Sequence, residues 1–294
     1  MDKKERILFI INPISGVGKQ KKAELAIEET LDKERFSFDI AYTKYAHHAT
    51  AMCLRVALRK NYDIVAIVGG DGSINDCVRG LENTDIKLAI IPAGSGNGLA
   101  RTLKIPLNIN QAIQAINHNK SIYIDTITLN DTICASIAGI GFDALVAKEF
   151  AKTKTRGFNT YFQIIASRYP FYKPKYYVLE IDGTPLETEA LFICFANSNQ
   201  FGYNTIIAPS ASLTDGYIDV ICVRKIPITL LPFVANLLFT KMFDHSIYVK
   251  TYKAKQVRIL SQTVTGINID GEYSEIEGNI NLTIKEKTLH IIIP

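Results

Sequence analysis

The stretch Asp63-Ile64-Val65-Ala66-Ile67-Val68-Gly69-Gly70-Asp71-Gly72-Ser73-Ile74-Asn75-Asp76 organises the interpretation of the whole chain. Its first half is a short run of branched apolar side chains, which predicts a buried strand. Its second half places glycines around one carboxylate, and the apolar residues Ile74, Val78 and Leu81 then follow at helical spacing. The chain is therefore expected to leave a strand, make a turn with little side-chain bulk, and enter a helix.

This turn has the features of a phosphate site. Free backbone N–H groups and the positive end of a helix dipole both favour phosphate. Asp71 would repel phosphate unless a divalent cation lies between them, so the combination predicts a nucleotide–Mg²⁺ site. The alternative is a tight strand-to-helix turn in which Asp71 or Ser73 caps the helix.

Length and composition indicate a folded protein with two domains. The chain has 294 residues, of which 47% are hydrophobic, and that length is enough for two cores. A net charge of +4 permits attraction to anionic lipid or nucleotide, but no concentrated basic stripe indicates a nucleic-acid binder. The five cysteines are widely spaced and form no CxxC pair, which is typical of core residues in the reducing cytoplasm.

The apolar segments do not predict a membrane span. The run that begins at Ile7 is too short for a signal peptide and is ended by Asn12 and Pro13. The longest run, residues 226–240, contains two prolines and is shorter than the roughly 20 residues that a span needs. It is expected to be a buried or interfacial helix.

Three polar turns rich in small residues each follow an expected strand in the first part of the chain. They cover residues 12–19, 69–73 and 92–98. The first is not a Walker A loop, because Pro13 and Gln20 stand where that motif has Gly and Ser or Thr. Up to about residue 119 strands and helices alternate, which predicts a parallel sheet with helices on both faces. The three turns should then meet at the carboxyl edge of that sheet, where ligands bind in such folds.

From about residue 121 the pattern changes to strands separated by turns such as Asp182-Gly183, Asp215-Gly216 and Asp270-Gly271. The expected strands near the end of the chain cover 264–270, 279–285 and 287–293. Two helical segments, about 142–169 and 228–240, interrupt them. We therefore predict a Rossmann-like α/β domain over residues 1–123 and an antiparallel β-sandwich domain over 124–294. The end of the chain, about ten residues, could pack back on the first domain.

Four motifs in this order resemble the diacylglycerol kinase catalytic-domain family, which includes bacterial soluble lipid kinases and the sphingosine and ceramide kinases. They are Asn12-Pro13…Gly16, Gly69-Gly70-Asp71-Gly72-Ser73, Pro92-Ala93-Gly94-Ser95-Gly96-Asn97 and Asp270-Gly271-Glu272. The resemblance covers essentially the whole chain. The sequence Gly94-Ser95-Gly96-Asn97 in the 92–98 turn is more similar to the sphingosine and ceramide kinase branch of the family.

The resemblance implies that ATP binds in the cleft between the two domains with Mg²⁺, and that Asp71 acts at the catalytic metal. By position, the residues implied to bind the nucleotide are Asn12, Pro13, Ile14, Ser15, Gly16, Thr43, Gly70, Asp71, Gly72, Ser73, Ile74, Asn75, Asp76 and Ser95. A structural Mg²⁺ site is implied at Asp215 with the backbone carbonyls of Ser212 and Tyr217. The general base is implied to be Glu272, with Asp270 beside it on the same side of a strand end.

The expected function is an ATP- and Mg²⁺-dependent lipid kinase that phosphorylates a hydroxyl of diacylglycerol, a sphingoid base or a related lipid. The protein is expected in the cytoplasm with transient contact to a membrane surface, and its state, monomer or homodimer, is left open. One alternative is a kinase of NAD or another small alcohol. A second is a nucleotide-binding regulator without catalysis, because Ser73, Asp76 and Gly98 differ from the commoner family residues.

Overall fold

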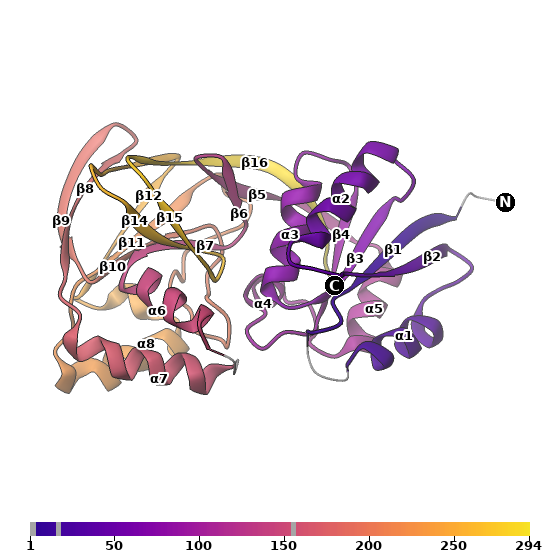
Figure 1. The fold of residues 1–294 in the computed structure, drawn as a ribbon, viewed down its shortest axis with the longest axis horizontal. Coiled ribbons are helices and arrows are strands. Elements are labelled where there is room, and N and C mark those ends of the chain that lie inside the picture. Colours follow the sequence, from indigo (N-terminus) through magenta and orange to yellow (C-terminus); the bar gives the residue numbers. More distant parts are fainter. Residues whose placement is uncertain (1–3, 16–18, 154–156) are drawn as a thin grey trace. The chain divides into compact units, whose positions relative to one another are not determined.

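The computed structural model describes residues 4–15, 19–153 and 157–294, which form two compact units (Figure 1). The first unit contains residues 1–124 and 287–294, and the second contains residues 125–286. Each unit is described below by itself.

The first unit is built on parallel strands in the order β2-β1-β3-β4, with β16 beside β4. Its strands are β1 (Glu5–Ile11), β2 (Phe36–Tyr42), β3 (Ile64–Gly69) and β4 (Lys87–Pro92), together with the start of β5 (Ser121–Leu129) and the end of β16 (Ile280–Ile292). Its helices are α1 (Lys19–Thr30), α2 (His48–Arg59), α3 (Asp71–Leu81), α4 (Gly98–Thr102) and α5 (Ile109–His118).

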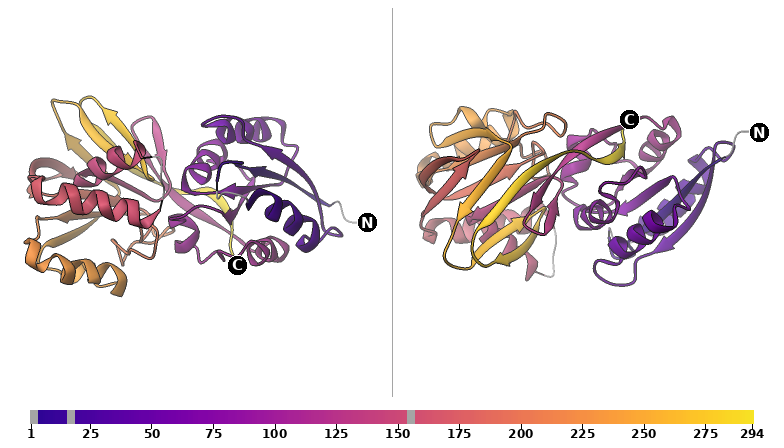
Figure 2. Two further views of the ribbon diagram at one scale, coloured as in Figure 1. Left: turned by 60° about the horizontal axis from the view of Figure 1, so that its bottom comes forward. Right: turned by 90° about the horizontal axis from the view of Figure 1, so that it is seen from above.

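The central strands of this sheet are apolar because helices cover both faces. Every residue of β3 is buried, as expected for a parallel strand packed from two sides. Helices α1 and α5 pack against each other, as do α2 and α3, and the two pairs lie on opposite faces of the sheet (Figures 1 and 2). The carboxyl ends of β1, β3 and β4 therefore lie at one edge, where the three polar turns begin.

The second unit is an antiparallel sandwich. One sheet has the strand order β12-β11-β10-β7-β14-β15, and the other includes β13, β8, β9 and the first part of β16. The strands that lie wholly in this unit are β6 (Thr132–Cys134), β7 (Ile137–Gly141), β8 (Lys175–Ile181), β9 (Thr184–Ala190), β10 (Phe192–Ala196), β11 (Ile218–Val223), β12 (Val249–Ala254), β13 (Gln256–Leu260), β14 (Thr265–Ile269) and β15 (Glu272–Ile276).

One apolar core fills the space between these two sheets, and it includes Phe195, Ile140, Val257 and Leu282. Helix α8 (Leu231–Thr240) packs on the other face of the six-stranded sheet through a second cluster, to which Cys194, Ile221 and Val234 belong. Helices α6 (Phe142–Ala151) and α7 (Phe158–Arg168) meet in a third cluster, which includes Phe142 and Tyr169. The 3₁₀ turns of this unit are η1 (Tyr169–Phe171), η2 (Ile228–Leu230) and η3 (Phe243–His245). The predicted fold class, a parallel α/β domain followed by an antiparallel β-sandwich, is confirmed.

The sequence interpretation was wrong at the last strand. Two strands were expected, over 279–285 and 287–293, but β16 runs without interruption from Ile280 to Ile292 (Figure 2). The charged residues Lys285, Glu286 and Lys287 resemble a turn in the sequence. In the structure they lie within the strand, and only Lys287 takes a left-handed conformation, with φ 55°.

No helix in the described parts of the chain is both long enough and apolar enough to cross a membrane.

Candidate active site

The side chain of Asn12 joins the turn after β1 to the turn after β3. Its Nδ2 donates a hydrogen bond to Ser73 Oγ at 2.8 Å, and its Oδ1 accepts one from the N–H of Ile14 at 3.1 Å. The N–H of Thr43, the residue after β2, donates to the carbonyl of Ile11. Gly16, which the sequence assigned to the same turn, lies outside the described residues.

The turns after β3 and β4 approach so closely that neither has room for a side chain at the contact. A Cβ on Gly94 would lie 2.5 Å from the Cα of Gly70, and a Cβ on Gly70 would lie 3.0 Å from the Cα of Gly94. Glycine is therefore required at both positions for backbone packing. The side chain of Asn97 closes the second of these turns, because it accepts from Gly94 N–H and donates to Gly94 C=O.

The carboxylate of Asp71 holds the same two turns together. Its Oδ2 accepts the N–H of Asn97 at 2.8 Å, and its Oδ1 accepts the N–H of Gly98 at 2.7 Å. Burial raises the pKa of this carboxyl above its usual range, and the two N–H groups act in the opposite direction. Each carboxylate oxygen has a second acceptor position, so these bonds leave Asp71 able to meet a cation or a water.

The remaining residues of the predicted nucleotide site divide into buried and exposed sets. Ile74 is fully buried in α3, and Asn75 and Asp76 are buried beside it. Asp76 Oδ1 lies 2.9 Å from His47 Nδ1 and 3.6 Å from an Arg79 nitrogen. These side chains are held within the unit. The exposed residues at the ends of the turns are Ile14, Gly72 and Ser95, with Pro13 and Ser15 half-buried.

In the second unit, both oxygens of the Asp270 carboxylate accept hydrogen bonds from the chain. Its oxygens accept backbone N–H groups of Ala135, Ser136 and Ile137 at 2.7–3.0 Å, and the thiol of Cys134 at 3.3 Å. Burial raises the pKa of this carboxyl, while the backbone donors oppose the rise. The expectation that Asp270 and Glu272 share one side of a strand was wrong, because Asp270 lies in a turn with φ 51°.

Glu272 begins β15 and pairs with Ile269 across the hairpin formed with β14. The two residues between them, Asp270 and Gly271, both have positive φ, the backbone that tight two-residue hairpins favour. Glu272 is half-buried. The tight turn therefore separates the two carboxylates by role: Asp270 fixes the turn, and Glu272 follows it at the start of the strand.

Two residues that sequence reasoning missed support this hairpin. Asn268 Oδ1 accepts the N–H of Gly271 at 2.9 Å, and Asn268 Nδ2 donates to Asp143 Oδ2 at 2.8 Å. Asp143 is buried in the first turn of α6, and burial raises the pKa of its carboxyl to about 6. Gly139 makes room for it, because a Cβ there would lie 2.0 Å from Asp143 Oδ2. The signal in the sequence is a lone Asp at an otherwise apolar helix start.

A third missed residue, Asp125, lies in the middle of β5 and is buried. Its Oδ2 accepts the N–H of Gly216 at 2.9 Å, and its own N–H donates to the carbonyl of Leu213 at 2.7 Å. These bonds fix the turn that carries Ser212, Asp215 and Tyr217. The clue in the sequence was an acidic residue inside an apolar strand pattern.

The residues at that turn do not fit the structural Mg²⁺ that the resemblance implied. Asp215 Oδ1 accepts the N–H of Tyr217 at 3.1 Å, and Asp215 Oδ2 forms an ion pair with Lys253 Nζ. A divalent cation on this carboxylate would lie beside an ammonium group, and like charges at short range repel. Among the described residues, no group of three or more His, Cys, Asp or Glu side chains could hold a metal.

The raised pKa of Asp143 gives the stability of the protein a pH dependence. In the folded state the Asp143 carboxyl keeps its proton up to about pH 6, whereas the usual pKa of an aspartate is 3.8. The stability from this group is thus present below pH 3.8 and is lost as the pH rises to about 6. We expect Asp143→Asn to remove this pH dependence. The free energy of unfolding changes by about 3 kcal/mol over this pH range, because the pKa is shifted by about two units. Urea unfolding at several pH values measures it, and an unchanged slope in the variant would contradict the assignment.

Comparison with known proteins identifies both units. Residues 6–129 match the diacylglycerol kinase catalytic domain, and residues 136–292 match the YegS C-terminal NAD kinase beta sandwich-like domain. A diacylglycerol kinase of Staphylococcus saprophyticus is 29% identical over 97% of this chain and 94% of its own length. One from Staphylococcus aureus is 30% identical over 93% of this chain and 87% of its own length. One from Bacillus subtilis is 28% identical over 99% and 97%.

Solved structures agree with this result. A Bacillus anthracis protein provisionally assigned as a diacylglycerol kinase matches with a TM-score of 0.83 and 25% identity, over 100% of this chain and 99% of its own. The matches cover both units of the chain in sequence order, and the relatives are matched over most of their own length. This chain belongs to the diacylglycerol kinase family of lipid kinases.

Proposed function

We propose that this protein transfers the γ-phosphate of ATP, bound with Mg²⁺, to a hydroxyl of diacylglycerol, a sphingoid base or a related lipid. The observation that carries the proposal is the pair of glycine turns joined by Asp71 at the carboxyl ends of β3 and β4. Such turns offer backbone N–H groups to phosphate without side-chain bulk. Family membership supplies the lipid hydroxyl as the acceptor.

In this proposal the first unit binds the nucleotide. The turns that begin at Asn12, Gly70 and Ser95 contact the phosphates through their backbone, and Thr43 extends the same edge. Because Ile74, Asn75 and Asp76 are buried, they act by shaping α3 and not by side-chain contact. Phosphoryl transfer depends mostly on positioning and on neutralising charge. The free acceptor positions of the Asp71 carboxylate suit a Mg²⁺ ion, directly or through a water.

We further propose that Glu272 is the general base. It accepts the proton of the lipid hydroxyl as the new O–P bond forms and the bond to the leaving ADP breaks. Asp270 is a poor candidate, because its oxygens already accept three backbone N–H groups and a thiol. Asp270 instead fixes the turn that places Glu272 at the start of β15.

Substituting these two acids separates the two roles. We expect Glu272→Gln to lower kcat by roughly 10²–10⁴-fold, because the amide cannot accept the proton, and to change the melting temperature less than Asp270→Asn does, because Glu272 is only half-buried. We expect Asp270→Asn to lower the melting temperature, because an amide cannot accept all of the donors around it. Kinetics and thermal unfolding of the two variants provide the measurements. Full activity in Glu272→Gln would move the base elsewhere.

Transfer of labelled phosphate from ATP to a panel of acceptors tests the function itself. The panel contains diacylglycerol, sphingosine, ceramide, phosphatidylglycerol and NAD. Label in extracted lipid supports the proposal, and the best acceptor identifies the substrate class. Label in NAD alone would support the alternative kinase of a small alcohol. Nucleotide binding without turnover on any acceptor would support the alternative of a non-catalytic regulator.

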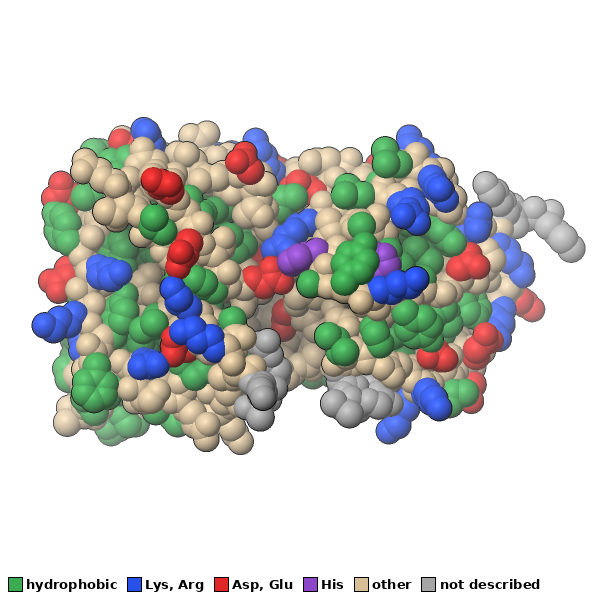
Figure 3. Space-filling model, viewed as in Figure 1, with side chains coloured by type: hydrophobic (Ala, Val, Ile, Leu, Met, Phe, Trp, Pro, Cys, Tyr) green, Lys and Arg blue, Asp and Glu red, His purple; other side chains and the backbone are tan. Residues whose placement is uncertain are grey.

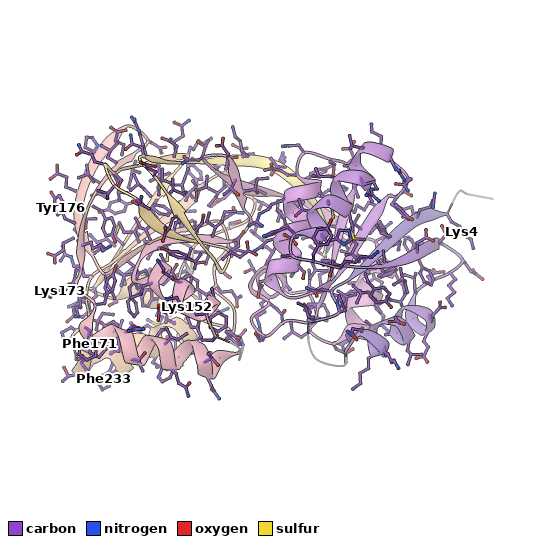
Figure 4. All side chains as sticks on the ribbon, viewed as in Figure 1. Lys4, Lys152, Phe171, Lys173, Tyr176 and Phe233 are labelled. Carbon is purple, nitrogen blue, oxygen red and sulfur yellow. The ribbon has the colours of Figure 1, made fainter. Side chains whose placement is uncertain are left out.

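We also propose that the protein contacts a membrane surface transiently through the helical layer of its second unit. Phe171 of η1 is 84% exposed, Phe233 of α8 is 73% exposed and Ile228 of η2 is 60% exposed. Leu231 packs against the apolar cluster that contains Tyr169, so η1 and the start of α8 share this cluster. Figure 3 shows hydrophobic and basic side chains on this part of the surface, and Figure 4 labels Phe171, Phe233 and Lys173 at the same end of the second unit in that view. Exposed aromatic side chains beside lysine suit an anionic lipid surface.

Vesicle binding tests this contact. We expect Phe171→Ser with Phe233→Ser to reduce co-sedimentation with phosphatidylglycerol vesicles roughly tenfold or more, because two large apolar side chains no longer leave water on binding. Leu58→Ser is the matched control, since Leu58 is 85% exposed but lies on α2 of the first unit. Equal binding of the double variant and the wild type would contradict the proposed surface.

A further inference from the structure

Lys253 lies where two acidic side chains of the second unit converge. Its Nζ forms an ion pair with Asp215 Oδ2 and lies 3.7 Å from Asp219 Oδ2. Asp215 belongs to the turn before β11, Asp219 to β11 itself and Lys253 to β12. The three charges therefore come from two neighbouring strands and the turn that leads into them.

The strand register places the lysine beside this acid pair. Asp219 and Lys253 are direct partners in the antiparallel pairing of β11 with β12. Side chains of directly paired residues lie on the same face and close together. The ammonium group is thus brought to the acids by the sheet and does not depend on a chance surface contact.

Asp219 makes a positive charge necessary at this point. Its side chain is only 2% exposed. Its Oδ1 accepts the hydroxyl of Ser210 at 2.8 Å, whereas its Oδ2 has no hydrogen-bond partner within the described residues. A buried carboxylate oxygen without a hydrogen bond needs a cation nearby, and Lys253 is the cation that the structure provides.

We propose that the ammonium group of Lys253 takes the place of a divalent cation at Asp215 and Asp219, so that the 212–217 turn keeps its form without a metal. The turn is otherwise held by Asp125 through Gly216 and Leu213, and Lys253 supplies the missing positive charge. Removing the ammonium leaves a pair of carboxylates whose position suits a hard divalent ion. This inference concerns the fold of the second unit and stands whether or not the proposed lipid specificity holds.

The test uses the full chain without nucleotide and compares Lys253→Met with Lys250→Met. Lys250 is the matched control because it is an exposed lysine on the same strand, where its partner in β11 is Cys222. Thermal unfolding is followed by circular dichroism in EDTA and then in Mg²⁺ or Ca²⁺. We expect the wild type and Lys250→Met to melt at the same temperature under both conditions.

We expect Lys253→Met to melt lower in EDTA, by about 2–4 °C or more, and to recover when a divalent ion is added. Three results would each overturn the proposal. They are a wild type that loses stability in EDTA, a Lys253→Met variant that melts like the wild type in EDTA, and a variant whose loss no divalent ion restores.

A second variant covers the case in which Lys253→Met does not fold. Adding Asp215→Asn to it removes one of the uncompensated charges, so the double variant should fold and be insensitive to Mg²⁺. If the double variant also fails to fold, the lysine acts through the packing of its stem and the proposal is wrong. Mn²⁺ binding to the nucleotide-free protein gives an independent readout: the wild type should show no site that Asp215→Asn removes, and Lys253→Met should gain one.

Discussion

The two hydrogen bonds from Asn97 and Gly98 to the Asp71 carboxylate are the contact on which the loops of the first unit depend. Adjacent parallel strands place two bare turns at one edge, where the N–H of Ala93 donates to the carbonyl of Gly69, and the Asp71 carboxylate adds two further bonds between them. The carboxylate satisfies two N–H groups at the start of α4 that would otherwise lack a partner. Because Gly70 and Gly94 have no side chains, the two turns can approach as closely as these hydrogen bonds require.

The second unit uses carboxylates in the same way. Asp270 accepts three N–H groups that precede and begin β7, and Asp125 accepts one at the turn before β11. In each case the cost of removing the charge from water is offset by backbone donors that need an acceptor. A carboxylate committed in this way positions the chain. Glu272 follows such a turn, at the start of β15, and is half-buried.

Much of the first unit could be predicted from sequence because its strands, turns and helices are determined by residues close together in the chain. Apolar runs such as 64–68 and the glycine turns after them identify strand, turn and helix without reference to distant residues. The partners of Asp71 could not be predicted in this way, since they lie more than 25 residues away. The same limit explains the errors at Asp270, whose donors are 133–136 residues distant, and at the charged segment inside β16.

The supporting residues Asp125, Asp143 and Asn268 were missed for a related reason. Each is a polar side chain within an apolar pattern, and a pattern alone does not say which backbone group it meets. The metal site implied at Asp215 rests on a family motif alone. Lys253, which forms an ion pair with Asp215, lies on β12 and belongs to no motif, so the sequence did not show this contact.

The long strand β16 has a consequence for how the protein forms during synthesis. Residues 280–283 pair with β13 in the second unit, whereas Ile291 pairs with Leu88 of β4 in the first. The first unit therefore lacks the strand that lies beside β4 until residues 287–292 have been made, which is after the whole of the second unit. Until then the open edge of β4 would be exposed to other chains. The sheet of the first unit is thus completed only after the second unit has been made, although β1 to β4 are made first.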